Sequence, residues 1–110
     1  MEIVETRENA VVILEPRGRI DASTAGLLEE KVLRLLDGGE RRLVFDLAGL
    51  DYISSAGLRV FLVAAKRLRS GGGTVALAAL QDRVHAVFEM AGLLSTLRVC
   101  RTREEAVAVA

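Results

Sequence analysis

The sequence is poor in aromatic residues and in the residue types that build disulfides and metal sites. Only 4% of its 110 residues are aromatic and none is Trp, so Val, Leu, Ile and Ala must form the core; 51% of the chain is hydrophobic, which is enough for one. The single cysteine, Cys100, excludes an internal disulfide and fits a reducing compartment. The single histidine, His85, cannot make a metal site with Cys100 as its only soft companion.

Net charge and long apolar runs are also missing. Fifteen basic and fifteen acidic residues cancel, so neither nucleic acid nor an anionic membrane is expected as a partner. No apolar run reaches the ~18 residues that a membrane-spanning helix needs, and the first residues lack the basic and apolar regions of a signal peptide. We therefore expect one cytoplasmic domain over residues 1–110, with no membrane insertion.

Apolar periodicity and turn residues predict strands and helices in alternation. The strands are expected at residues 2–6, 11–15, 42–47, 74–79 and 97–99. The first helix is expected from a cap at Asp21 or Ser23 to Gly38, the second from Ser55 to about Arg69, and the third from Asp82 to Met90. The last helix is expected to follow a capping box at Thr102 and Glu105 and to run to the end. Pro16 should make the second strand irregular or place it at an edge. Such alternation predicts parallel strands joined by crossover helices.

The most informative segment is residues 43–58. It reads as an apolar strand, a short acidic turn, the pair Ser54-Ser55, and the start of an apolar helix. A serine at a helix start lies beside unpaired backbone N–H groups and the positive end of the helix dipole, which favours a phosphate. The simpler alternative is that one serine only caps the helix.

A phosphate at this position would change the local charge sharply. It adds about −1.5 to −2 charges. Asp21, Asp46 and Asp51 could lie at the same end of the sheet and would oppose it. A surface that binds a partner while neutral would then lose it on phosphorylation, so this pattern favours a regulatory switch.

Enzymatic alternatives find little support in the residues. A serine hydrolase would need Gly-x-Ser-x-Gly and a histidine, whereas Ile53-Ser54-Ser55-Ala56-Gly57 lacks the first glycine and His85 lies on a different predicted helix. The run Gly71-Gly72-Gly73 is not followed by the Lys-Ser/Thr of a phosphate-binding loop. We predict no catalytic residue, no metal ligand and no cofactor.

Three segments together resemble STAS domains, and specifically bacterial anti-sigma factor antagonists. The signature lies in Phe45-Asp46-Leu47 through Asp51-Tyr52-Ile53-Ser54-Ser55-Ala56-Gly57-Leu58. Gly18-Arg19-Ile20-Asp21-Ala22-Ser23-Thr24 resembles the family's strand-to-helix junction, and Val87-Phe88-Glu89-Met90-Ala91-Gly92-Leu93 resembles one of its helix ends. The segments follow the family's order and span most of the chain.

The resemblance implies an α/β fold in a single STAS-type domain, with a mixed, mostly parallel sheet of four to five strands and about four helices packed mainly on one side. It also implies partner switching. The unphosphorylated antagonist binds an anti-sigma factor, which releases the sigma factor. The anti-sigma factor is a serine kinase that phosphorylates the antagonist, and a serine phosphatase restores it. ATP and magnesium belong to the kinase, and a monomer is expected for the free antagonist.

The resemblance also implies roles for particular residues. The phosphoacceptor lies one or two residues before the motif glycine, which Gly57 matches; Ala56 has no hydroxyl, so the role maps to Ser55, with Ser54 as the alternative acceptor. The expected partner-binding residues are Asp21, Thr24, Asp46, Asp51, Ser54, Gly57 and Leu58. The alternative function is a STAS subunit without this switch, such as a stressosome scaffold or a lipid-transport accessory protein.

Overall fold

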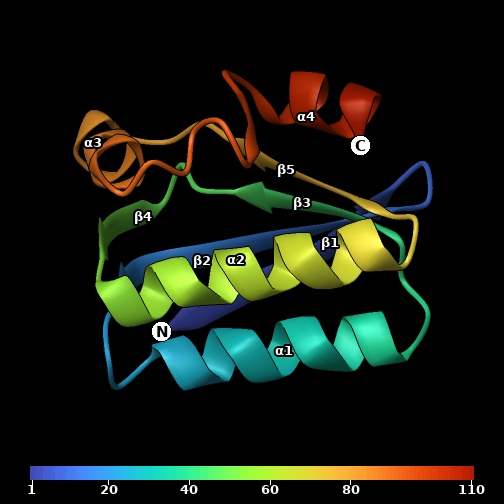
Figure 1. Ribbon diagram of the computed structural model, residues 1–110, viewed down its shortest axis with the longest axis horizontal. Helices are drawn as coiled ribbons and strands as arrows, with labels where there is room; N and C mark the ends of the chain where they lie inside the picture. Colours follow the sequence, from blue (N-terminus) through green and yellow to red (C-terminus); the bar gives the residue numbers. More distant parts are fainter.

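The chain begins with an antiparallel hairpin and continues with strands and helices in alternation (Figure 1). The computed structural model describes residues 1–110. The elements are β1 (Glu2–Glu8), β2 (Val11–Ile20), α1 (Ala25–Asp37), β3 (Arg42–Asp46), β4 (Leu50–Ile53), α2 (Ser55–Ser70), β5 (Thr74–Ala78), α3 (Asp82–Met90), β6 (Arg98–Cys100) and α4 (Arg103–Val109). The predicted α/β fold is confirmed, with six strands where four to five were expected.

One mixed sheet holds all the strands. Its order is β1-β2-β3-β5-β6, and β4 pairs with β2 off this path. Only the β1–β2 pair is antiparallel. The hairpin turn is tighter than the four residues predicted, because Asn9 and Ala10 take φ angles of 52° and 66°. Two successive positive φ angles characterise a two-residue hairpin turn whose twist matches that of the strands.

Strand β2 changes its parallel partner half-way along its length. Residues 12–14 pair with β3, and residues 18–20 pair with β4. Pro16 lies between the two segments, where no parallel neighbour requires a backbone N–H, so the sheet is irregular there although β2 is an interior strand. Strand β4 lies where an acidic turn was predicted, and that prediction is wrong. Four residues with an exposed Asp51-Tyr52 pair in their middle give too short a pattern to identify.

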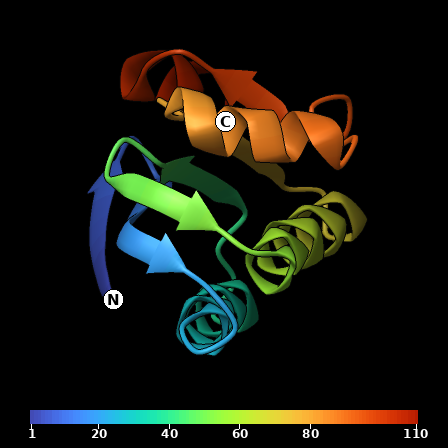
Figure 2. The same ribbon diagram turned by 90° about the vertical axis from the view of Figure 1, so that its left-hand side faces the viewer.

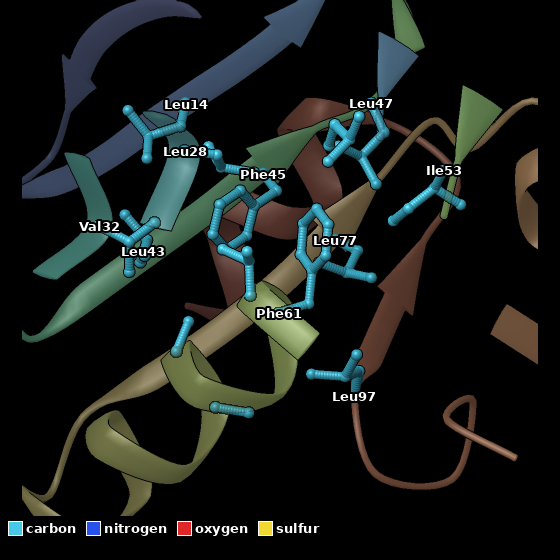
Figure 3. Packing of buried hydrophobic residues seen from close by; sticks show 14 of the residues in the cluster. Leu14, Leu28, Val32, Leu43, Phe45, Leu47, Ile53, Phe61, Leu77 and Leu97 are labelled. Carbon is cyan, nitrogen blue, oxygen red and sulfur yellow. The ribbon is translucent and has the colours of Figure 1, made fainter. Parts of the chain in front are cut away.

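Helices α1 and α2 lie side by side on one face of the sheet, and α4 lies on the other (Figures 1 and 2). Helices α1, α2 and α3 bury their apolar residues in one large cluster, whereas α4 covers a smaller cluster on the opposite face with Ala106 and Val107. Leu43 and Phe45 of β3 point into the large cluster and Val44 into the small one, as expected for a strand covered on both sides. The aromatic rings of Phe45, Phe61 and Phe88 stack edge to face at the centre of the large cluster, two of them drawn in Figure 3.

Two predicted helix caps need correction. Thr24 is the N-cap of α1, so neither Asp21 nor Ser23 takes that position. The Asp21 carboxylate instead accepts N–H groups in the turn before the helix. At α4 the Thr102 hydroxyl accepts the Glu105 N–H as predicted, but the Glu105 carboxylate accepts from Arg101 N–H, one residue earlier than a capping box requires. None of the helices combines the length and the apolar character that a membrane crossing needs.

Candidate functional site

Two parallel strands end side by side and bring the two polar motifs together. Ile20 pairs with Ile53, and the Ser54 N–H donates to the Ile20 carbonyl at 2.8 Å. Asp21 and Ser54 are therefore the first residues beyond two paired strand ends. Helices α1 and α2 start from this edge next to each other (Figure 2). We call Asp21–Thr24 together with Ser54–Gly57 the serine junction.

Gly57 allows the first turn of α2 to lie directly on these strand ends. A Cβ atom added to Gly57 would lie 2.6 Å from Cγ2 of Ile20 and 2.8 Å from Cγ1 of Ile53, closer than carbon atoms pack. Both isoleucines are buried in the large cluster. Glycine is thus required here by close packing, and it fixes the start of α2 against β2 and β4.

The two adjacent serines have different roles. Ser54 is the N-cap of α2, with extended backbone angles and a hydroxyl that accepts the Gly57 N–H at 3.2 Å. Ser55 is the first residue of the helix; its side chain is exposed and its hydroxyl forms no hydrogen bond within the protein. The cap is therefore provided by Ser54, and the Ser55 hydroxyl is free and accessible.

Asp21 is held in a turn by its own neighbours. Its carboxylate accepts the Ser23 hydroxyl at 2.7 Å and the backbone N–H groups of Ser23 and Thr24 at 2.9 and 3.2 Å. These hydrogen bonds, the Ser23 hydroxyl first among them, hold the pKa of Asp21 below its ordinary value. The Thr24 hydroxyl donates to the Arg19 carbonyl and accepts the Asp21 N–H. Asp21 thus presents a fixed negative charge, while the Thr24 hydroxyl is used within the turn.

The remaining predicted residues around the serines differ in exposure. Asp51 is exposed and accepts from Nε2 of Gln81 at 3.2 Å, whereas Leu58 is half-buried against the large cluster. The Arg19 guanidinium lies 4.1 Å from the centre of the exposed Tyr52 ring, a contact that no pattern in the sequence indicates. Arg19 of β2 is paired with Tyr52 of β4, and this pairing creates the contact. It could not be predicted without knowing that residues 50–53 form a strand.

Asp46 lies elsewhere, and the expectation that it flanks the serines is wrong. Because Phe45 pairs with Leu14, β3 ends beside Glu15, five residues before Ile20, which is about 16 Å along an extended strand. The Asp46 carboxylate accepts from Nε of Arg103 on α4 at 2.9 Å and is only 12% exposed. Arg103 also pairs with Glu15 and, at 3.9 Å, with Glu8. We call these four residues the Arg103 cluster.

His85 and Cys100 line one open pocket of about 450 Å³ between α3 and β6. Burial raises the pKa of the Cys100 thiol, so it is protonated at neutral pH. No group of three or more His, Cys, Asp or Glu side chains could hold a metal ion. The Cys100 thiol in this pocket is therefore not in its nucleophilic thiolate form.

Comparison with known proteins agrees with the architecture and the motifs. The family model of the STAS domain matches residues 2–106. The chain belongs to the STAS domain family. A protein of Bordetella bronchiseptica assigned as an anti-sigma factor antagonist is 42% identical over 108 residues, covering 98% of this chain and 93% of the relative. The anti-sigma-B factor antagonist of Bacillus subtilis is 30% identical over 105 residues, 94% of each chain.

A solved structure agrees as well. The crystal structure of a protein from Thermotoga maritima, assigned as an anti-sigma factor antagonist, superposes with a TM-score of 0.93 and 25% identity, covering 97% of this chain and 92% of that one. The similarity of this STAS domain to that structure therefore extends over nearly the whole chain.

Proposed function

We propose that this STAS protein is an anti-sigma factor antagonist. Its unphosphorylated form binds an anti-sigma factor serine kinase and frees the sigma factor, and phosphorylation of Ser55 ends that binding. The observation that carries the proposal is the difference between the two serines. Ser54 caps the helix, and the Ser55 hydroxyl is exposed and free. The names of the relatives support the antagonist role.

The proposed contact surface consists of the serine junction and the residues next to it. Its exposed or half-buried members are Asp21, Thr24, Asp51, Ser54, Ser55 and Leu58, and the buried Gly57 holds the start of α2 beneath them. Asp21 and Asp51 already give this surface two negative charges, and a phosphate on Ser55 adds about −1.5 to −2 more. A partner surface that accommodates the two carboxylates would then meet strong additional like charge, which costs several kcal/mol across an interface.

The switch requires no cofactor bound to this chain. The kinase supplies ATP and magnesium, a serine phosphatase removes the phosphate, and the free antagonist is a monomer composed of one domain. Since the released sigma factor acts on transcription, the proposed site of action is the cytoplasm. The protein itself binds and is modified, and it performs no catalytic step.

Titration calorimetry with the anti-sigma kinase encoded nearest to this protein tests the proposal. We expect Ser55→Ala to bind like the unmodified protein, and Ser55→Asp to bind at least about tenfold more weakly. Ser70→Asp is the matched control, because Ser70 is an exposed serine at the other end of the same helix. It should leave binding unchanged. Equal affinity of Ser55→Ala and Ser55→Asp would contradict the switch and favour a STAS subunit that does not switch.

A further inference from the structure

Arg59 is a free cation one turn beyond Ser55 on α2. Its side chain is exposed and takes part in no ion pair and no hydrogen bond. Two other helix arginines pair with carboxylates: Arg34 with Glu30 and Arg67 with Asp37, each at 2.8 Å. The first turn of α2 contains no acidic residue that could pair with Arg59.

We propose that Arg59 binds the phosphate of phosphorylated Ser55 and positions it along the surface of α2. This rests on the proposed function, which supplies the phosphate. Residues four apart lie on the same face of a helix, and an anion that precedes its cation by four residues is the favourable orientation. Glu30 and Arg34 demonstrate this arrangement within the same protein, on α1.

The pairing favours Ser55 over Ser54 as its partner. Ser54 precedes the helix as its N-cap, with extended backbone angles, and its hydroxyl already accepts the Gly57 N–H, so it lacks the four-residue helical spacing that Ser55 has with Arg59. The guanidinium offers parallel N–H donors that match two phosphate oxygens. It therefore favours the dianionic phosphate over the monoanion. Phosphorylation would also change Arg59 from a free cation into a neutralised one, so two features of the contact surface change at once.

A phosphate titration followed by ³¹P NMR tests the pairing without any kinase. Phosphoserine is installed at position 55 during translation, and the second pKa of the phosphate is measured in the parent, in Arg59→Gln and in Lys66→Gln. Lys66 is the matched control, because it is an exposed cation without an ion pair on the same helix, eleven residues from Ser55. We expect that pKa to rise by about 0.3 in Arg59→Gln, as an exposed pair of this spacing predicts.

The control variant should titrate like the parent, and Arg59→Lys should recover part of the lower value, because it keeps the charge and loses the paired donors. The same pKa in the parent and in Arg59→Gln would overturn the proposal. Failure of the antagonist function would instead appear as equal kinase binding of Ser55→Ala and Ser55→Asp, an outcome that leaves this titration unaffected. The two proposals therefore fail separately.

Discussion

Asp21 and Asp46 occupy equivalent places in the sequence and different places in the molecule. Each comes at the end of an apolar strand, β2 and β3 respectively. Asp21 is bound only by the hydroxyls and N–H groups of its own turn, whereas Asp46 is held by Arg103, 57 residues away. The serine junction around Asp21 remains available to a partner, and the Arg103 cluster is satisfied internally. The ion pair with Arg103 therefore distinguishes the structural carboxylate of Asp46 from that of Asp21, which lies on the proposed contact surface.

The largest expected effect is at the serine junction, where Gly57→Ala would force a methyl group between Ile20 and Ile53. We expect a loss of about 1–3 kcal/mol in the free energy of unfolding, as for overpacked cores. Urea denaturation measures it. Gly26→Ala is the control: Gly26 is an exposed glycine in α1 with nothing within 4 Å of an added Cβ, so alanine should be neutral or stabilising. Equal behaviour of the two variants would contradict the close packing of α2.

The Arg103 cluster should depend on its cation. Arg103→Gln leaves the carboxylates of Glu8 and Asp46 without a positive partner and leaves Glu15 with Arg17 alone. We expect about 1–2 kcal/mol of destabilisation, between the values for exposed and buried pairs. Kinase binding should not change, because the cluster lies away from the serine junction. The control is Arg34→Gln, which breaks an exposed pair and should cost less than about 0.5 kcal/mol. Weakened kinase binding by Arg103→Gln would contradict the separation of the Arg103 cluster from the serine junction.

Within the serine junction, Ser54 should contribute to the stability of the protein and Ser55 should not. Ser54→Ala removes the cap of α2 and should cost about 1 kcal/mol. Ser55→Ala removes a hydroxyl that binds nothing in the protein and should change stability by less than about 0.5 kcal/mol. Thermal unfolding of both variants checks this order. Larger destabilisation by Ser55→Ala than by Ser54→Ala would show that the assignment of the cap is reversed.

The smallest effect concerns the charge of Asp21. Because its pKa is lower in the folded protein than its ordinary value of 3.8, the folded state favours the carboxylate, and this stabilisation is complete above that value. It is lost as the pH falls through the lower, folded pKa. The parent should therefore lose more stability than Asp21→Asn on acidification below pH 3.8. Parallel pH profiles would indicate that the turn does not depend on the ionised carboxylate.

Local signals in the sequence predicted most of the fold. The bounds of α3 agree with the prediction from its apolar spacing, and α2 begins where the serine pair and the apolar run placed it. The location of Asp46 could not be predicted, because it depends on how far β3 is staggered against β2. Local pattern could not tell which of Ser54 and Ser55 caps the helix, since serine suits a cap at either position and only the backbone angles and the hydrogen bond to Gly57 identify Ser54.

Mass spectrometry of the protein with fragment mapping, before and after incubation with ATP and the anti-sigma kinase encoded nearest to it, tests the central claim most directly. The account predicts one phosphate on Ser55, which a phosphatase removes, which persists in Ser54→Ala and which is absent from Ser55→Ala. A phosphate on Ser54, or no phosphate on either serine, would contradict the assignment of Ser55 as the switch.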